Sequence, residues 1–296
     1  MSAASLRRGD TAELRAWLDF ALALCDEADA TAMASFRREV EVSTKPDRSL
    51  VTAADRAIEE RLRERIRARF PDHGLVGEEF GSQDEERPVR WYLDPIDGTH
   101  NFVRGIPLFG TLLAAERDGE LLVGVISAPA LRSRWWALRG GGAWAAGDAA
   151  GHADAGAIGA ETGLPLRAPP RRLAVSRVQR IEDAQLLYGS VGEVERSGRA
   201  PGLRSVLARA WRERGFGDFW GYALVAEGAA EAMLEVDVNA WDLAAPLVIV
   251  EEAGGRFTDL GGERAIHGRT VLASNGLLHD ELLAALASGK GRAGPA

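Results

Sequence analysis

The chain has 296 residues, 46% of them apolar and 27% charged, a composition typical of a globular protein with a sizeable core. Its formal net charge of −8 offers no electrostatic attraction for nucleic acid or an anionic membrane, so neither partner is expected. No apolar run approaches the roughly 20 residues that span a bilayer, and the first residues lack the apolar core of a signal peptide, so the cytoplasm is the expected compartment.

Two helices are predicted at the start of the chain. Apolar residues recur on one face between Thr11 and Arg37, and the only cysteine, Cys25, lies among them. A single cysteine excludes an intrachain disulfide and a cysteine-based zinc site. Thr52 and Asp55 have the spacing of a capping box, which predicts a second helix that ends before Pro71.

Short apolar runs separated by turn residues follow, and they predict strands. These strands are expected at 74–77, 90–94, 112–115, 121–127 and 135–138.

The stretch 140–170 is rich in glycine, alanine and proline, and it is predicted to be a loop and a domain junction. Strands and helices then alternate. The strands are expected at 173–176, 185–190, 233–236 and 270–273, the helices at 204–214, 222–230, 243–253 and 279–287, and a disordered tail at 288–296.

The main chemical signal is the segment WYLDPIDGTHNF at 91–102. An apolar run leads into Asp94 and Asp97, and a proline and a glycine turn the backbone there. Such a turn can bring both carboxylates and the carbonyl group of Ile96 to one point, and oxygen ligands on a tight turn suit magnesium. Taken alone, the motif is equally typical of an ordinary acidic turn.

Gly98 and Thr99 directly follow these carboxylates. Their backbone N–H groups can hold a phosphate, and a helix that begins here would add its N-terminus to the site. Because an acidic protein needs a local source of positive charge to bind such an anion, metal ions at Asp94 and Asp97 are an economical source.

Three further acidic residues accompany the motif, and each has a simpler interpretation when taken alone. Glu78 follows an apolar run, but it and Glu79 are also a plausible solvated pair. Asp242 opens a long apolar helix, where the helix dipole alone favours an acid. Asp55 is explained by its capping position.

Together these segments resemble the inositol monophosphatase family of magnesium-dependent phosphatases, over residues 11 to 288. Four blocks occur in the family's order and at its usual separations. They are VTAADRAIEE (51–60), GLVGEEF (74–80), WYLDPIDGTHNFVRGIP (91–107) and AWDLAAPLVIVEEAGG (240–255).

The resemblance implies a metal site of two or three magnesium ions. The ligands would be Glu78, Asp94, the Ile96 carbonyl, Asp97 and Asp242. Among the catalytic residues, Glu78 and Thr99 would orient the water that attacks phosphorus in line, and Asp55 would lie near the most weakly bound ion.

The resemblance also implies which residues bind the phosphomonoester. These are Ile96, Asp97, Gly98, Thr99, Arg214, Asp218, Glu235 and Asp242. Glu235 occupies the place of a family carboxylate that contacts the organic part of the substrate. Arg214 is equally typical of a surface residue, and no definite role is predicted for His100.

The segment GDFWGYALVAEG (217–228) resembles the histidinol-phosphate phosphatase branch of the family. Asp218 and Glu235 would place two acids near the leaving group, which suits the cationic histidinol, although a polyol also accepts carboxylates. L-Histidinol phosphate, a precursor in histidine biosynthesis, is therefore the expected substrate. Inositol 1-phosphate and a 3′(2′),5′-bisphosphate nucleotide remain alternatives, as does a catalytically silent regulatory module of the same fold.

The fold that the resemblance implies mixes α+β and α/β character in a layered α-β-α-β-α sandwich. An N-terminal α+β half (1–150) would carry most metal ligands, and a C-terminal α/β half (171–290) would carry Asp242 and the residues that contact the substrate. Relatives are commonly homodimers, so a homodimer is expected.

Overall fold

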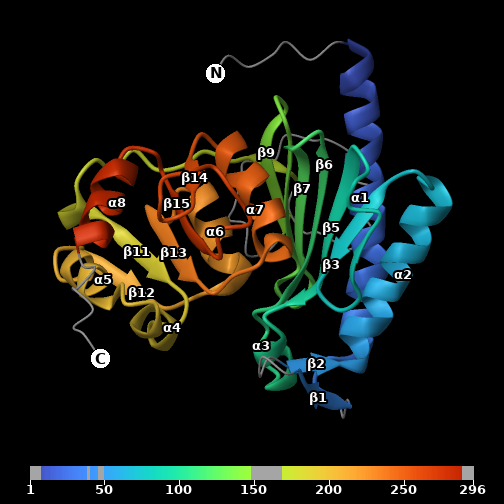
Figure 1. Cartoon of the computed structure of the whole chain (residues 1–296), viewed down its shortest axis with the longest axis horizontal. Helices are drawn as coiled ribbons and strands as arrows, with labels where there is room; N and C mark the ends of the chain where they lie inside the picture. Colours follow the sequence, from blue (N-terminus) through green and yellow to red (C-terminus); the bar gives the residue numbers. More distant parts are fainter. Residues whose placement is uncertain (1–7, 39–40, 46–49, 148–168, 289–296) are drawn as a thin grey trace.

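The computed structural model describes residues 8–38, 41–45, 50–147 and 169–288. Two large sheets and the helices around them make up most of this part of the chain (Figure 1). A small antiparallel pair, β1 (Val42–Thr44) and β2 (Leu50–Thr52), lies next to the start of α2.

The first sheet has eight strands in the order β10-β9-β8-β7-β6-β5-β3-β4. Its neighbours pair antiparallel, except for β3 and β5, which run parallel. The strands are β3 (Gly74–Gly77), β4 (Gly81–Gln83), β5 (Val89–Asp97), β6 (Gly110–Arg117), β7 (Glu120–Ala128), β8 (Ser133–Leu138), β9 (Gly142–Gly147) and β10 (Arg171–Arg172).

The second sheet has five strands in the order β12-β11-β13-β15-β14. β11 runs parallel to β12 and β13, whereas β15 is antiparallel to both of its neighbours. The strands are β11 (Gln185–Tyr188), β12 (Arg212–Arg214), β13 (Ala232–Val236), β14 (Arg256–Thr258) and β15 (Thr270–Ser274).

Helices form three layers around these sheets (Figure 1). They are α1 (Arg8–Ser35), α2 (Ala53–Arg69), α3 (Thr99–Val103), α4 (Val191–Arg196), α5 (Ala200–Leu207), α6 (Asp218–Ala226), α7 (Ala240–Glu252) and α8 (His279–Ser288), with single 3-10 turns at Pro129–Leu131 and Ile181–Asp183.

Three buried apolar clusters fill the spaces between five layers, which are α1–α2, the first sheet, α6–α7, the second sheet and α5–α8. The first, around Trp17, lies between the α1–α2 pair and the first sheet. The second, around Leu247, packs α6 and α7 between the two sheets. The third, around Leu203, lies between the second sheet and α5 and α8. This arrangement confirms the predicted layered sandwich.

Strand β5 directs its side chains to two of these clusters in turn. Trp91 and Leu93 belong to the cluster next to α1 and α2, whereas Tyr92 belongs to the one next to α7. Because side chains alternate along a strand, Asp94 falls on the α7 side. The pairing with β6 then shifts between Asp94 and Asp97, where the sheet ends.

Most predicted elements are confirmed, but two are wrong. The helix expected at 204–214 is α5 followed by β12, because Pro201 starts the helix earlier and residues 212–214 pair with β11 instead. The strand expected at 173–176 is missing among the described residues, because regular pairing with β9 stops at Arg172.

The predicted loop at 140–170 is also corrected in part. Its first residues form β9, which pairs with β8 along its whole length, and the small side chains there are buried. Residues 148–168 lie outside the described residues, as do residues 289–296 of the predicted disordered tail, and Ser288 ends α8. The division into two halves stays a prediction.

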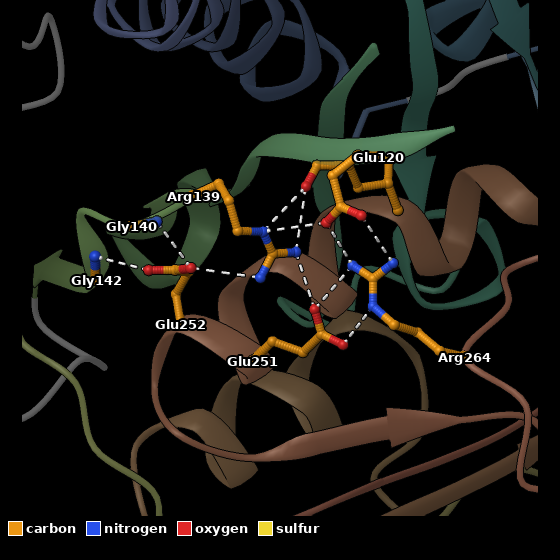
Figure 2. A network of polar contacts seen from close by, with 8 residues as sticks. Glu120, Arg139, Gly140, Gly142, Glu251, Glu252 and Arg264 are labelled. Carbon is orange, nitrogen blue, oxygen red and sulfur yellow. Dashed lines mark hydrogen bonds and ion pairs between the residues drawn. The ribbon is translucent and has the colours of Figure 1, made fainter. Parts of the chain in front are cut away.

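A polar network links the first sheet to the C-terminal end of α7 (Figure 2). Arg139, after β8, forms ion pairs with Glu251 (2.9 Å) and Glu252 (3.3 Å) of α7. Arg264, from the loop after β14, bonds to Glu251 (2.7 Å) and to Glu120 of β7 (3.0 Å). The network therefore ties elements of both sheets to one helix.

Among the described residues, no helix is both long enough and apolar enough to cross a membrane.

Candidate active site

Asp94 and Asp97 lie at the end of β5, where the strand leaves the sheet. Asp94 is buried, at 1% exposure. Gly98 follows with a φ of 81°, a left-handed conformation that glycine adopts without strain and that turns the chain into α3. The turn predicted from the sequence is thus present.

Thr99, the first residue of α3, is buried and connects this turn to α2. Its hydroxyl oxygen lies 2.9 Å from the Ile96 carbonyl oxygen and 3.2 Å from Asp55 Oδ1. One hydroxyl proton serves these two acceptors, so a lone pair of the Thr99 oxygen stays available to a further donor. Helix α3 has only five residues, so its dipole adds little to anion binding.

Asp55 caps α2, as predicted, and also contacts Thr99. Its Oδ2 accepts hydrogen bonds from the backbone N–H (2.8 Å) and the hydroxyl (2.5 Å) of Thr52, which completes the predicted capping box of α2. Its Oδ1 faces Thr99. The capping interaction therefore also fixes a carboxylate beside the candidate phosphate segment.

Glu78 follows β3, and its backbone N–H donates to the Leu93 carbonyl of β5 (3.2 Å). Its side chain accepts a hydrogen bond from the ammonium group of Lys45 (2.8 Å), which also binds Glu79 (2.6 Å). Burial raises the pKa of Glu78 to about 7 against the opposing effect of Lys45, and Asp242 adds to the rise.

Asp242 lies in the first turn of α7, as predicted. Its Oδ2 accepts the N–H of Asn239 (2.7 Å), so it too closes a capping box. Burial raises its pKa to about 6, although the bonds from Asn239 act in the opposite direction.

The predicted ligands lie near enough to one another to affect one another's pKa. Burial, then Glu78, Asp97 and Asp242, raise the pKa of Asp94 well above its usual range. Burial, then Asp218 and Asp242, do the same for Asp97. Such mutual effects require proximity across a region of low dielectric. The structure thus brings together the carboxylates predicted as metal ligands, from β5, the end of β3 and α7.

Among the described residues, no group of three or more histidine, cysteine, aspartate or glutamate side chains is already arranged to hold a metal ion. Three of the predicted ligands have protein partners in this structure: Lys45 binds Glu78, and backbone N–H groups bind Asp242 and Asp97. Asp94 Oδ1, by contrast, is buried and accepts no hydrogen bond from any residue that the structure describes.

A buried carboxylate oxygen without a partner is costly, and like charges beside it increase the cost. The available donors are all oxygen atoms, which is the ligand set of hard divalent cations such as magnesium. The residues therefore fit a magnesium site once Glu78, Asp97 and Asp242 turn away from their protein partners.

A second acidic group lies beside this cluster, at the start of α6. Asp218 accepts a hydrogen bond from Asn101 Nδ2 (3.2 Å), and Glu235 of β13 accepts the N–H of Asp218 (3.0 Å) and the hydroxyl of Tyr222. Burial, then Asp218, raise the pKa of Glu235 to about 8. Both residues predicted to contact the leaving group are therefore adjacent.

Arg214 is not brought to the carboxylates within the described chain. It ends the edge strand β12, its side chain is exposed, and its Nη1 donates to the Glu213 carbonyl (2.7 Å). Its contact with a bound substrate stays a prediction.

A cavity of about 430 Å³ is lined by neighbours of the predicted metal ligands but by none of the ligands themselves. Its walls include Val76 and Tyr92, each two residues before a predicted metal ligand, and Trp241, next to Asp242.

Sequence patterns did not identify Lys45, Asn101 or Tyr222, although each donates a hydrogen bond to a carboxylate of the site. None belongs to a local sequence motif that predicts such a contact. Only the tertiary structure places them there.

Comparison with known proteins agrees with this geometry. Residues 13–291 match the sequence profile of the inositol monophosphatase family. A protein named histidinol-phosphatase from Mycobacterium tuberculosis is 43% identical over 92% of this chain and 98% of its own length. Another of that name, from Streptomyces coelicolor, is 42% identical over 90% and 95%. The solved structure of a Thermotoga maritima IMPase is 30% identical, covers 92% of this chain and 97% of its own, and superposes with a TM-score of 0.76.

Proposed function

The chain belongs to the inositol monophosphatase family, a family of metal-dependent phosphatases of small phosphomonoesters, and we propose that its substrate is L-histidinol phosphate. The products would be L-histidinol and inorganic phosphate. The observation that carries this proposal is the higher identity to the two proteins named histidinol-phosphatase than to the T. maritima IMPase.

We propose that Glu78, Asp94, the Ile96 carbonyl, Asp97 and Asp242 hold two or three magnesium ions. The unpartnered oxygen of Asp94 supports this assignment most directly. Bound magnesium would lower the pKa of the attacking water and neutralise charge on the phosphate. Lys45, which now neutralises Glu78 and Glu79, would have to release Glu78.

Thr99 and Glu78 would orient the attacking water. The hydroxyl proton of Thr99 is directed to Asp55 Oδ1 or the Ile96 carbonyl, so its oxygen can accept a hydrogen bond from the water. The Glu78 carboxylate would accept a hydrogen bond from the other O–H group of the same water. With both of its O–H groups hydrogen-bonded, the water would direct a lone pair at phosphorus, on the side opposite the departing alcohol oxygen.

The backbone N–H groups of Gly98 and Thr99 would hold the phosphate oxygens beside Asp97. The alcohol would then lie toward the start of α6, where Asp218 and Glu235 are found. Histidinol carries an ammonium group, and a carboxylate beside it forms a charge-assisted hydrogen bond. A direct contact of Arg214 with the substrate is the least supported of these assignments, because its guanidinium is exposed on β12.

We also propose, as the family resemblance implies, that the protein acts as a homodimer in the cytoplasm. Size-exclusion chromatography with light scattering would reveal a monomer if the first proposal is wrong, and cell fractionation tests the second.

Phosphate release on three esters tests the substrate. The purified protein with magnesium would be assayed on L-histidinol phosphate, inositol 1-phosphate and 3′-phosphoadenosine 5′-phosphate. A clear preference in kcat/KM for histidinol phosphate is expected. A preference for either other ester would assign the protein to that substrate instead, and no release from any ester would favour a catalytically silent module.

A further inference from the structure

The turn that carries Glu78 is attached to α2 by a buried carboxylate. β3 and β4 form a hairpin whose turn is residues 78–80. The backbone N–H groups of Glu79 and Phe80 both donate to Glu59, to Oε2 (2.6 Å) and to Oε1 (3.2 Å) respectively. Glu59 lies on α2 and has 0% exposure. One buried side chain therefore binds the two consecutive N–H groups that follow Glu78.

Arg63, one helical turn after Glu59, completes this attachment. Its Nε donates to Glu59 Oε1 (2.7 Å), and its Nη2 donates to the carbonyl of Gly81, directly after the turn. Its guanidinium carbon also lies 5.8 Å from the centre of the Phe80 ring. Because Glu59 and Arg63 are both buried, water competes little for their ion pair.

Gly77, the residue before Glu78, packs its backbone directly against this ion pair. A Cβ on Gly77 would lie 2.6 Å from the Glu59 carboxyl carbon and 2.7 Å from Arg63 Nη2, distances too short for any side chain. Both contacts involve the ends of flexible side chains. An alanine at position 77 would therefore displace the Glu59 carboxylate and the Arg63 guanidinium from their present places.

The same face of α2 also reaches α3. Asp55, Glu59 and Arg63 follow one another at intervals of four residues, so they lie along one side of the helix. Asp55 accepts the hydroxyl of Thr99 (3.2 Å), and Glu59 binds the turn that carries Glu78. Helix α2 thus contacts both of the segments whose side chains are proposed to orient the attacking water.

From these contacts we infer that Glu59 and Arg63 are positioning residues of the proposed magnesium site, and that they act by fixing the backbone around Glu78. The inference rests on the proposed function, in which Glu78 is a magnesium ligand. Glu78 has to leave Lys45 when an ion binds. A turn that is already fixed loses less conformational entropy in that step, which favours tighter binding of magnesium.

Glu59→Gln tests this inference, and Glu60→Gln, at its exposed neighbour on α2, is the matched control. A glutamine at position 59 turns one acceptor oxygen into an N–H donor that faces another donor, so the turn is released. Isothermal titration calorimetry of the EDTA-treated protein measures the Kd for magnesium. The Kd should rise about ten-fold in Glu59→Gln and stay within about two-fold of wild type in Glu60→Gln. An unchanged Kd in Glu59→Gln would overturn the inference.

Combination with Glu78→Gln shows whether Glu59 acts through Glu78. Glu78→Gln should weaken magnesium binding by itself, because it removes the charge of a ligand. Adding Glu59→Gln should then raise the Kd by less than about two-fold more, since both changes act on one ligand. If Glu59→Gln has its full effect without the Glu78 carboxylate, Glu59 acts by another route and the inference is wrong.

Gly77→Ala gives a second test that keeps every charge, and it decides the inference if Glu59→Gln does not fold. Its Cβ displaces the Glu59 carboxylate from the turn. The Kd for magnesium should again rise about ten-fold, and the magnesium concentration for half-maximal phosphate release should rise with it. Wild-type values of both quantities in Gly77→Ala would contradict the inference.

Arg134→Met separates positioning from a general loss of stability. It breaks a different buried ion pair, between β8 and Asp29 of α1. Its Tm in EDTA should fall, whereas its Kd for magnesium should stay within about two-fold of wild type, because the two sites share no partners. Equal weakening of magnesium binding in Arg134→Met and Glu59→Gln would assign both effects to stability and refute the positioning role.

Wild type decides the proposed metal site independently of these variants. If wild type binds no magnesium in the titration, the metal site is wrong and the inference fails with it. If wild type binds magnesium and Glu59→Gln and Gly77→Ala bind it equally well, only the positioning role is overturned.

Discussion

Asp94 is buried among other acids, and within the described part of the chain its Oδ1 has no hydrogen-bond partner, which makes its charge unfavourable. Replacing it with Asn removes a charge from this group. We therefore expect Asp94→Asn to have a higher Tm than wild type in EDTA, since the repulsion in the cluster is relieved.

Added magnesium should reverse the order of the two Tm values, so that wild type becomes more stable than Asp94→Asn. Wild type is expected to gain stability as magnesium is added, by about 2.7 kcal/mol at a hundred times the Kd, whereas Asp94→Asn should gain much less. Thermal unfolding with and without magnesium measures both effects. Asp19→Asn, at an exposed pair on α1, is the control and should respond as wild type does. Equal magnesium shifts in wild type and Asp94→Asn would contradict the metal site.

His279 gives a prediction for acid stability. It is buried, and its ring nitrogens lie 2.9 Å from the Thr258 hydroxyl oxygen and 2.8 Å from that of Ser274. Burial, and then Arg256, lower its pKa from 6.5 to about 4. Folding therefore favours the neutral ring, so this contribution is complete above pH 6.5 and is lost as the pH falls toward 4.

The stability difference between wild type and His279→Asn should therefore shrink on acidification, by up to on the order of 3 kcal/mol. Urea unfolding at several pH values between 7 and 4 measures it. Comparison with the variant cancels the carboxylates whose pKa values are raised, which act in the opposite direction. A difference that stays constant with pH would refute a neutral, buried His279.

For individual residues, the sequence indicated the acidic side chains of the site but not the residues that hydrogen-bond to them. Asp94, Asp97 and Asp242 stand at a strand end and a helix start, positions that local pattern reveals. Lys45 and Asn101 act on residues far along the chain, which no local pattern encodes. The positions of these acids on their strand and helix were thus predictable, whereas their hydrogen bonds were not; their assignment as metal ligands comes from the family resemblance and stays a prediction.

Among the elements, α1 is attached to the first sheet by a buried arginine. The Arg134 guanidinium, on β8, forms ion pairs with Asp29 (2.6 Å) and Asp26 (2.9 Å) of α1, and its Nε donates to Ser127 (2.9 Å). Arg134 has 0% exposure. Because Asp29 is also buried, removal of Arg134 would leave it without its cation.

Arg134→Met is therefore expected to lower the free energy of unfolding by about 3–5 kcal/mol, and Asp29→Asn in the same chain should recover part of the loss. Urea unfolding measures both. The exposed pair Arg15–Asp19 on the same helix supplies the control, and Arg15→Met should change stability by less than about 1 kcal/mol. A small loss in Arg134→Met would mean that apolar packing alone holds α1.

Elements with strong periodicity were predictable, and short edge strands were not. The helices α1 and α2 follow their apolar stripes, and α2 begins at its capping box. Strand β12 has three residues, two of them exposed, and forms only because β11 lies beside it. Strand β9 consists of small residues that a packed sheet accommodates but that composition alone assigns to a loop.

For the molecule as a whole, the network in Figure 2 joins the first sheet, α7 and the segment after β14. Its members are partly exposed, with 21% exposure for Arg139 and 39% for Arg264. Both guanidinium groups bind Glu251, so the network should contribute more than isolated surface pairs but remain sensitive to salt.

Arg139→Ala is expected to lower the free energy of unfolding by about 1–2 kcal/mol at low salt and by less at 1 M NaCl, with kcat unchanged, because the network lies outside the carboxylate cluster. Arg264→Ala should cost less, since that residue is more exposed. Urea unfolding at two salt concentrations gives the comparison. An effect that is independent of salt would point to lost packing of the arginine side chain instead.

The layered architecture was expected from the family resemblance, and the alternation of strands and helices in both parts of the sequence agrees with it. The place of α7 among the layers was harder to predict, because its residues are apolar around most of the helix. Only the structure shows that it packs between both sheets. Its position also brings Asp242 near the carboxylates at the end of β5.

The most direct test of the metal-dependent phosphatase is release of phosphate from L-histidinol phosphate by EDTA-treated protein as magnesium is restored, for wild type and Asp94→Asn. We expect no release by wild type without magnesium, saturable recovery with it, and a rate at least about a thousand-fold lower in Asp94→Asn. Equal release without magnesium, or an undiminished rate in Asp94→Asn, would contradict the carboxylate cluster as the catalytic metal site.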